Sequence, residues 1–427
     1  TVWSRVGAGS DVDTALTLRR RWHRSVEVRG TIPMTLGWWD VDVDEMGKMS
    51  SRLLEESNLE LVELLRQEIV GAGRMTFARF MEQALSHPMH GYYMSDAARA
   101  GFEGDFLTGP ETHRIFGQAL ARQIAECWDR LGQPAPFVVR EEGAGAGTLA
   151  RDILDGLRLE RLDLLEAIRY ELSDVNAVRI EQATLRLAPA GFGDRVGPAT
   201  DTPITGVLLA NELLDAFPVH RLIVQDSELR EVYVTWRDDW FADEVGPLSD
   251  VELASSLDGI MLHEGQRLEV SPEAARWASG IGSTLKRGYA ILIDYGYPAH
   301  ELYSGERAAG TLRTYSEHMV SDDPYRRVGR QDLTAHVDFT AIARAAEQGG
   351  CDVLGLTSQA FFFAGLGIEE LLIRLQTDAV SSDDYLAARQ MVMELMEPRG
   401  LGRFHVLLAG KGVEHEPRLR GLSFVLR

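Results

Sequence analysis

The chain has 427 residues, of which 45% are hydrophobic, so it can bury one large core or two. Acidic residues outnumber basic ones by 65 to 44, and the resulting net charge of −21 argues against a broad nucleic-acid-binding face. Cys127 and Cys351 lie far apart, which predicts neither a disulfide framework nor a zinc site and indicates a reducing compartment. Apolar runs such as residues 360–366 are shorter than the roughly 20 residues that a membrane span needs.

Residues 1–50 differ from the rest of the chain. They contain an arginine triplet at 19–21, an acidic run at 40–45, and no sustained helical or strand period. We expect disorder or weak structure in a non-native or loosely attached leader, with the natural start near Met46 or Met49. An Arg-rich transit peptide is the alternative, although such peptides are poor in acids. The expected compartment is the cytoplasm, or the mitochondrial matrix if the leader is a transit peptide.

Regular helical patterns follow this leader. Apolar residues at helical spacing predict helices over residues 59–70, 76–85 and 116–128. The segments between them, including residues 104–111, are rich in Gly, Pro and polar residues, and loops of this length are usually functional. We interpret residues 51–130 as an N-terminal helical lid region.

The next stretch combines a buried strand, a glycine-rich loop and a helix. The strand ends at Glu141, glycines alternate at Gly143, Gly145 and Gly147, and the helix begins near Thr148. Glycine lets the backbone approach a ligand closely, and the N–H groups of a helix start suit a polar or anionic ligand edge. The loop is not the dinucleotide fingerprint, because Thr148 stands where that pattern needs its third Gly. A tight turn without a ligand is the alternative interpretation.

Two further strands deliver polar residues to the same edge of the predicted sheet. Asp174 follows the strand predicted over residues 168–173, where a carboxylate can accept hydrogen bonds from ribose hydroxyls. Asn211, Glu212 and Asp215 follow the next buried strand, and two carboxylates there could orient a cationic acceptor. In the alternative interpretation, these three acidic residues only cap the helices that follow them.

The C-terminal half mixes strands with polar loops. Alternating apolar and polar residues predict an antiparallel hairpin, and we expect substrate-covering insertions near residues 220–245 and 296–340. His336 lies in the second segment, with Asp332 and Asp338 nearby, but their spacing matches no familiar metal-ligand set and we predict no metal. His336 is a candidate for the acceptor site, and a structural histidine is the alternative.

Several motifs occur in a fixed order between about residues 59 and 412. They are F-x-x-F-M-x-x-A-L-x-H-P-x-x-G-Y-Y from Phe77, G-D-F-x-T-x-P-E from Gly104, E-x-G-x-G-x-G-T-L from Glu141, A-N-E-L-L-D-A-F-P-V-H from Ala210, I-D-Y-G from Ile293 and G-x-Q-D-L-T-A-H-V-D-F from Gly329. Together they resemble the MidA family of S-adenosylmethionine (SAM) methyltransferases. The mitochondrial members of that family methylate an arginine on a complex I subunit.

The resemblance and the residue patterns together predict SAM as the cofactor. The predicted catalytic residues are Glu212, Asp215 and His336. The family usually has an apolar residue, a Pro and an Arg where this chain has Glu142, Ala144 and Ala146, which concerns affinity more than reaction class. The predicted cofactor-binding residues are Glu141, Gly143, Gly145, Gly147, Thr148, Asp174, Asn211 and the lid residues Gly104, Asp105 and Phe106.

The predicted fold is α/β, with a Rossmann-like class I methyltransferase sheet over residues 131–427, an N-terminal helical lid and a β insertion. The predicted function is SAM-dependent methyl transfer, with a protein arginine as acceptor by resemblance. An O- or N-methyltransferase of a small molecule or peptide is the runner-up, because a scaffold does not fix its substrate. A non-catalytic assembly factor and a nicotinamide dehydrogenase are the remaining alternatives. We expect no nucleic-acid partner and no membrane span, and a homodimer is a candidate assembly.

Overall fold

The computed structural model describes residues 53–95, 113–316, 319–377 and 381–424. The predicted leader at residues 1–50 and the predicted lid residues Gly104, Asp105 and Phe106 lie outside the described residues. Within the described ranges, no helix combines the length and the apolar character that crossing a bilayer requires.

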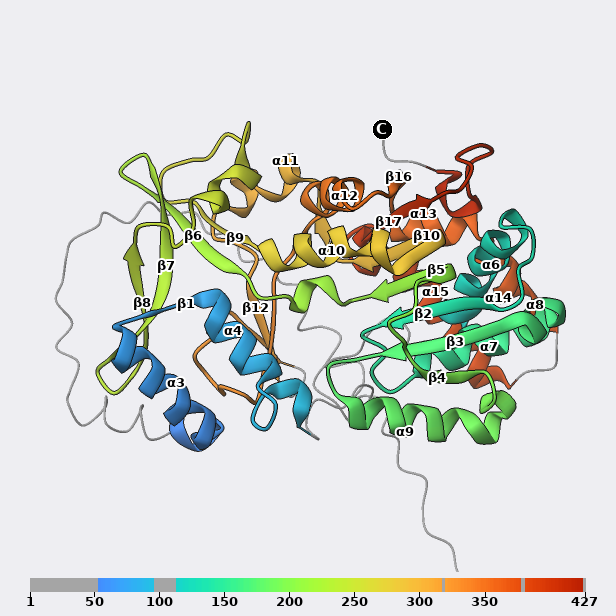
Figure 1. The fold of residues 1–427 in the computed structure, drawn as a ribbon, viewed down its shortest axis with the longest axis horizontal. Coiled ribbons are helices and arrows are strands. Elements are labelled where there is room, and N and C mark those ends of the chain that lie inside the picture. Colours follow the sequence, from blue (N-terminus) through green and yellow to red (C-terminus); the bar gives the residue numbers. More distant parts are fainter. Residues whose placement is uncertain (1–52, 96–112, 317–318, 378–380, 425–427) are drawn as a thin grey trace, which may run out of the picture. The chain divides into compact units, whose positions relative to one another are not determined.

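Seven strands form the central sheet in the order β16-β17-β10-β5-β2-β3-β4 (Figure 1). Five of them run parallel, whereas β17 is antiparallel to both β10 and β16. This mixed, mostly parallel sheet confirms the predicted fold class. The strands are β2 (Phe137–Glu142), β3 (Ile168–Ser173), β4 (Val196–Pro198), β5 (Ile204–Asn211), β10 (Leu285–Asp294), β16 (Asp352–Ser358) and β17 (His405–Lys411).

Helices cover both faces of this sheet because its central strands are apolar on both sides. In β10, Tyr289, Ile291 and Ile293 join one buried cluster, while Ala290 and Leu292 join another on the opposite face. The first cluster includes residues of α6 (Ile115–Arg130), α7 (Thr148–Glu160), α8 (Leu162–Ala167), α9 (Ala177–Leu187), α13 (Gln359–Gly365), α14 (Ile368–Thr377) and α15 (Ser382–Met396). The second includes residues of α10 (Pro272–Thr284) and α12 (Phe339–Gln348).

Helix α6 belongs to this core, although its sequence falls inside the predicted lid region of residues 51–130. Its apolar side chains pack in the same cluster as β2 and α7. Gly117 of α6 approaches α7 so closely that an added Cβ would lie 2.5 Å from Cβ of Asp152. Helix α6 therefore packs with the central sheet and its helices.

A second region combines the segments that the sequence suggested as a lid and as insertions. Strands β1, β7, β6 and β9 pair in that order, with β8 also on β7. Helices α3 and α4 pack on this sheet in one cluster with Leu333 of β14 (Figure 1). Phe80, Phe241 and Tyr325 form an aromatic group in that cluster. The elements are α3 (Leu59–Ala72), β1 (Met75–Thr76), α4 (Phe77–Ser86), β6 (His220–Gln225), β7 (Glu228–Arg237), β8 (Trp240–Gly246), β9 (Arg267–Val270), β12 (Arg313–Ser316), β13 (Met319–Ser321) and β14 (Asp332–Thr334).

Short elements lie between the longer helices and strands. Strand β11 follows the end of β10, and its parallel partner β15 precedes α12. The short elements are η1 (Tyr92–Met94), η2 (Ala188–Phe192), η3 (Leu214–Ala216), η4 (Val251–Leu257), β11 (Gly296–Tyr297), α11 (Ala299–Leu302), η5 (Gly305–Arg307), β15 (Val337–Asp338), η6 (Leu401–Arg403) and η7 (Arg420–Leu422).

The central sheet changes direction of winding at β2. Strands β3 and β4 lie on one side of it, and β5 and β10 lie on the other. In open α/β sheets, ligands bind beyond the carboxyl ends of the strands at such a reversal. The topology therefore predicts a ligand site at the segments that follow β2, β3 and β5.

Candidate active site

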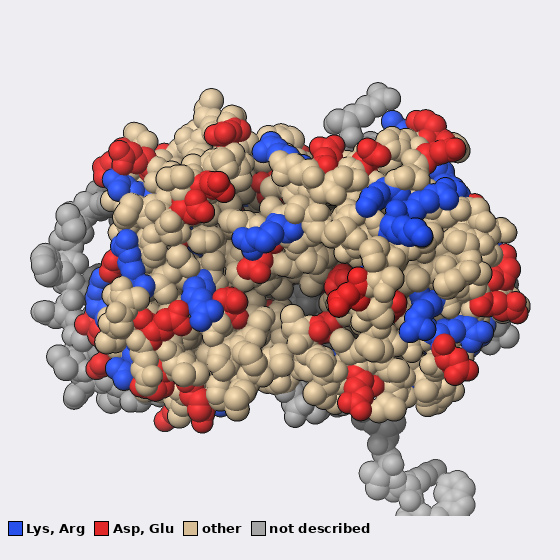
Figure 2. All heavy atoms as spheres, in the orientation of Figure 1, with Lys and Arg blue, Asp and Glu red and all other residues tan. Residues whose placement is uncertain are grey.

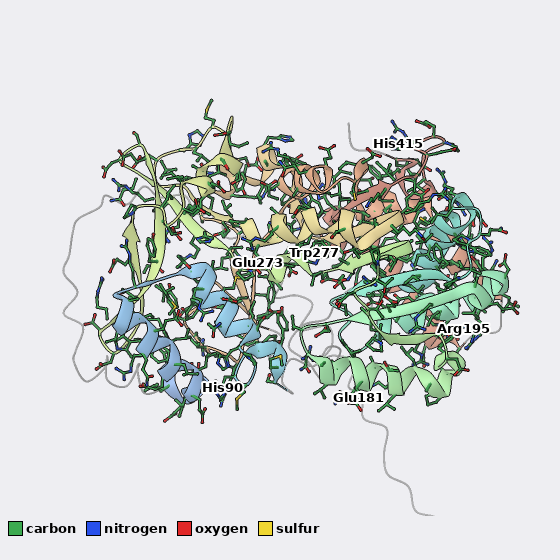
Figure 3. All side chains as sticks on the ribbon, in the orientation of Figure 1. His90, Glu181, Arg195, Glu273, Trp277 and His415 are labelled. Carbon is green, nitrogen blue, oxygen red and sulfur yellow. The ribbon has the colours of Figure 1, made fainter. Side chains whose placement is uncertain are left out.

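A cavity of about 610 Å³ lies where these segments meet the second region. The segments after β2, β3 and β5 form one wall, and α4, η1, β12 and β14 contribute to the other. In Figure 2, a hollow opens near the middle of the visible face, with acidic side chains beside it. Glu273 and Trp277, which both lie on α10 (Figure 3), also line the cavity.

The three glycines of the loop after β2 all have positive φ, but their surroundings differ. An added Cβ would lie 3.0 Å from Leu213 at Gly143 and 2.9 Å from Ala183 at Gly147, so both glycines allow close packing. At Gly145, with φ +51°, nothing lies within 4 Å of that position. Gly145 therefore leaves open space beside the backbone, where a ligand can approach.

Helix α7 begins directly after this loop at Thr148. Its N-cap is Gly147, and no side chain makes a capping hydrogen bond to its first N–H groups. Thr148 also lines the cavity. The helix start therefore offers backbone donors to a polar ligand.

Asp174 connects the end of β3 with the glycine loop. Its Oδ2 accepts a hydrogen bond from N–H of Gly145 at 2.9 Å, and its Oδ1 accepts one from N–H of Asn176 at 2.9 Å. The cap of α9 comes from Asn176, whose side chain accepts from N–H of Val178. The capping interpretation of Asp174 is therefore wrong, and its carboxylate lies at the cavity wall.

Glu141 ends the buried part of β2 and lines the cavity beside the loop. The hydroxyl of Tyr170 donates to Glu141 Oε2 at 2.6 Å. Burial raises the pKa of Glu141 to about 8, and the carboxylates of Asp174 and Asp152 act in the same direction. A cationic ligand group in the cavity would favour the ionised form of Glu141.

Asn211 and Glu212 follow β5. The Oδ1 atom of Asn211 is buried without a hydrogen-bond partner, while its Nδ2 donates to Glu212 Oε1 at 3.2 Å. Glu212 has φ +49°, a conformation in which non-glycine residues are strained. Such strain occurs most often at functional sites.

Asp215 lies within the short helical turn η3, and its own side chain makes no capping hydrogen bond to that turn. The carboxylate that accepts from the N–H groups of this turn is Asp294, so the capping interpretation of Glu212 and Asp215 is also wrong. Asp215 is only 6% exposed, and its Oδ2 accepts from the hydroxyl of Tyr295. Its Oδ1 has no partner. Burial raises the pKa of Asp215 to about 6.

A second pairing of tyrosine with aspartate lies at the cavity and was missed by the sequence interpretation. The hydroxyl of Tyr93 donates to Asp332 Oδ1 at 2.7 Å, and the backbone carbonyl of Tyr93 accepts from Asn176 Nδ2 at 3.1 Å. Tyr93 therefore joins β14 to the segment that follows Asp174. The G-Y-Y motif carried the only sequence signal for it.

His336 is not among the residues that line the cavity. Its ring packs against those of Tyr295 and Tyr297, at centroid distances of 5.5 and 5.7 Å. Burial lowers its pKa to about 4, so the imidazole is neutral at physiological pH. This position does not favour the predicted catalytic role of His336 and agrees better with the structural alternative.

Acidic side chains dominate the described lining of the cavity. Arg179 is the single basic residue of that lining, and six aromatic rings accompany it. All three residues that depart from the MidA pattern, Glu142, Ala144 and Ala146, also line the cavity. The eight acidic residues are Glu82, Glu141, Glu142, Asp174, Glu212, Asp215, Glu273 and Asp332. Within the described residues, no group of three or more His, Cys, Asp or Glu side chains is arranged to hold a metal ion.

The sequence model of a protein family described as "Putative S-adenosyl-L-methionine-dependent methyltransferase" matches residues 119–357, which is more than half of the chain. The chain belongs to this methyltransferase family. A solved Burkholderia thailandensis structure bound to S-adenosyl-homocysteine is 34% identical, covers 88% of this chain and 97% of its own, and superposes with a TM-score of 0.80. S-adenosylmethionine is thus the cofactor, and the predicted enzyme class is confirmed.

Curated relatives of the methyltransferase cover most of its length. The Drosophila melanogaster protein named "Protein arginine methyltransferase NDUFAF7 homolog, mitochondrial" is 28% identical over 92% of this chain and 94% of its own length. The Homo sapiens protein named "Protein arginine methyltransferase NDUFAF7, mitochondrial" is 28% identical over 79% of this chain and 80% of its own length.

Three features of the cavity suit the binding of the cofactor. The space beside Gly145 is open, the start of α7 has no side-chain cap, and Oδ1 of Asn211 is a buried acceptor without a partner. An unpaired buried acceptor is costly, and a donor such as the ammonium of SAM would relieve that cost. These features lie together at the carboxyl edge of the sheet.

Proposed function

We propose that this methyltransferase transfers a methyl group to an arginine side chain of a protein. The curated relatives carry that activity in their names. The supporting observation in the structure is Asp215, whose Oδ1 is unpartnered at the wall of a cavity whose described lining has eight acidic residues and one basic residue. Guanidinium stays protonated at physiological pH, so a site of this charge favours it over a neutral acceptor.

On the cofactor side, the glycine loop and the start of α7 would hold the amino-acid end of SAM, with Glu141 and Asn211 near its ammonium. Asp174 would accept hydrogen bonds from the ribose hydroxyls, because it stands at the end of the strand next to β2. When bound, SAM supplies a methyl group on a sulfonium, which a nucleophile attacks in line. Alignment and exclusion of water then provide most of the acceleration.

On the acceptor side, Asp215 and Asp332 are the carboxylates that would hold the guanidinium. The hydroxyl of Tyr295 donates to Asp215, and the hydroxyl of Tyr93 donates to Asp332. Each hydrogen bond fixes the orientation of its carboxylate. The unpartnered Oδ1 of Asp215 can accept a hydrogen bond from the substrate and then the proton that the methylated guanidinium releases. Glu212 adds a further negative charge at the same wall.

A protein substrate follows from this proposal. The predicted cytoplasmic location has no support in the relatives, because the curated ones are named mitochondrial proteins. The homodimer stays a prediction.

Methyl transfer to arginine is tested by incubating the purified chain with methyl-labelled SAM and cell extract. Precipitated protein is then hydrolysed in acid, and the amino acids are separated. We expect label in methylated arginine, and loss of that label with the Asp215→Asn variant under the same conditions. Label that is confined to another amino acid, or to the small-molecule fraction, would overturn the arginine acceptor and favour the runner-up function.

A further inference from the structure

Asp294 is the last residue of β10 and lies behind the acceptor wall of the cavity. It is 1% exposed and does not line the cavity. Strand β10 runs parallel to β5, with Ile293 opposite Asn211, so the end of β10 lies beside the segment that follows β5. That segment carries Glu212 and Asp215.

The carboxylate of Asp294 holds this segment through its backbone. Its Oδ2 accepts from the N–H groups of Leu213, Leu214 and Asp215 at 3.1, 2.8 and 3.3 Å. Its Oδ1 accepts from N–H of Tyr295 at 2.8 Å. Successive backbone N–H groups form a concave site for an anion, and here the anion is a side chain of the protein itself.

The segment needs such support because it does not stabilise its own conformation. Its helical part, η3, has only three residues, and its N-cap residue Leu213 has no side chain that could cap it. Glu212 has φ +49°, and its N–H donates to the carbonyl of Ile293 at 2.8 Å. A strained residue keeps its conformation only when the surrounding structure fixes it. The end of β10 therefore receives hydrogen bonds from four consecutive N–H groups, those of residues 212–215.

We propose that Asp294 is a positioning residue, whose carboxylate fixes the segment after β5 so that Glu212 and Asp215 present their side chains to the methyl acceptor. This inference rests on the proposed function for the nature of that acceptor. It assigns Asp294 a role on the acceptor side only, because none of its hydrogen bonds reaches the glycine loop or Asp174.

The electrostatic surroundings agree with a specific role. Burial raises the pKa of Asp294, and the neighbouring carboxylates of Asp215 and Glu212 raise it further. The hydrogen bonds from backbone N–H groups act in the opposite direction. An ionisable side chain at this position is costly, and a residue needed only for packing would be apolar.

The Asp294→Asn variant tests the proposal. Asparagine keeps the size of the side chain but replaces one carboxylate oxygen with an N–H₂ group, which cannot accept hydrogen bonds. Either the N–H of Tyr295 or the N–H groups of residues 213–215 therefore lose their acceptor. We expect the KM for an arginine-containing peptide to rise at least tenfold, with a smaller change in kcat and with the Kd for SAM within twofold of wild type. The matched control is Glu231→Gln, a fully buried carboxylate that also accepts from a backbone N–H but lies outside the cavity, and it should leave both constants unchanged.

A proportional loss of SAM affinity and peptide affinity in Asp294→Asn would overturn the proposal, because it would indicate a general structural role. Unchanged KM would overturn it as well.

Hydrogen–deuterium exchange of the wild-type chain gives a readout that needs no methyl acceptor and no variant. The amides of Leu213, Leu214 and Asp215 should exchange slowly although they lie beside an open cavity. Rapid exchange of these amides would contradict the role of Asp294. If the wild-type chain methylates no arginine but protects these amides, the proposed function fails and the anchoring by Asp294 stands.

Discussion

The cofactor side and the acceptor side of the cavity are built in different ways. On the cofactor side, Gly145 and Asp174 are 29 residues apart and belong to consecutive strand-to-helix units. On the acceptor side, Tyr295 and Asp215 are 80 residues apart, and Tyr93 and Asp332 are 239 apart. A local pattern can therefore specify the cofactor side, whereas the acceptor side depends on how distant segments pack.

The two sides also differ in their chemistry. The cofactor side offers backbone N–H groups and open space, which suit one fixed ligand. The acceptor side offers two carboxylates, the buried Asp215 and the half-buried Asp332, each of which accepts from a tyrosine hydroxyl. The cofactor side has one such pair, in which Tyr170 donates to Glu141. Substitutions on one side should consequently change one binding constant and spare the other.

The largest expected effect is that of Gly145→Val. A branched side chain there would occupy the open space beside the loop, so SAM affinity should fall by about 100-fold or more, or roughly 3 kcal/mol. The positive φ should add a stability cost of about 1–3 kcal/mol. Gly132→Val is the matched control, because Gly132 also has positive φ and nothing within 4 Å, but lies outside the cavity.

Calorimetric titration with SAM measures both variants, and thermal unfolding monitors their stability. Wild-type SAM affinity in Gly145→Val would show that the space beside this glycine is not the cofactor site.

The next largest effect is expected for Asp215→Asn. The substitution removes a charge-assisted hydrogen bond to the acceptor, worth about 1.5–3 kcal/mol, so kcat/KM should fall about 10- to 100-fold. SAM affinity should stay within twofold, because Asp215 belongs to the acceptor side. Steady-state kinetics measures kcat/KM, and calorimetry measures SAM affinity. Parallel losses in both would show that Asp215 does not act on the acceptor side alone.

The pH dependence of activity should report the same carboxylate. The pKa of Asp215 is raised to about 6 by burial, so its ionised form is lost below that pH and kcat/KM should fall about tenfold per pH unit. Tyr295 donates a hydrogen bond to this carboxylate, and the charge of Asp215 in turn raises the pKa of the neighbouring Asp294.

Unfolding should not cause that acidic loss. Because the folded pKa of Asp215 is raised, its contribution to stability is full below its unfolded pKa near 4 and is lost as the pH rises through about 6. A profile of kcat/KM from pH 5 to 8, with thermal unfolding at each pH, tests this. Asp215→Asn should flatten the acidic limb, and an unchanged limb in that variant would assign the titration to another group.

The smallest expected effect is that of Tyr93→Phe. It removes the hydrogen bond to Asp332, worth about 0.5–1.5 kcal/mol, so the acceptor KM should rise about two- to tenfold. SAM affinity should hardly change, because the backbone carbonyl that binds Asn176 remains. Tyr233→Phe, which removes a hydroxyl bonded to the carbonyl of Pro247 outside the cavity, is the control. A larger effect on SAM than on the acceptor would place Tyr93 on the cofactor side.

Part of the architecture was predictable from sequence because its causes are local. Buried apolar segments and the glycine loop predicted β2, β3 and β5 with the correct edge, and Asp174 at the end of β3 lines the cavity. The capping alternatives for Asp174 and Asp215 could not be rejected from sequence, since Asn176 and Asp294 supply those caps through contacts that only the fold creates.

Other interpretations depended on packing, which the sequence does not show. Helix α6 was assigned to a lid, although its apolar face joins the core of the sheet. His336 was placed near the acceptor, yet its ring is packed against Tyr295 and Tyr297, outside the lining of the cavity. The sequence could not show that the N-terminal helices and the insertions form one region.

The sequence by itself determined the enzyme family, the strand-loop-helix unit that suits SAM and the polar ends of the neighbouring strands, because short-range periodicity and backbone freedom govern them. Only the tertiary structure decided which side chains meet across the cavity. Tyr93 reaches Asp332, and Asp294 fixes the segment of Asp215, through hydrogen bonds between residues about 80 or more positions apart. Such pairs form only after the two regions have packed, so no local pattern records them.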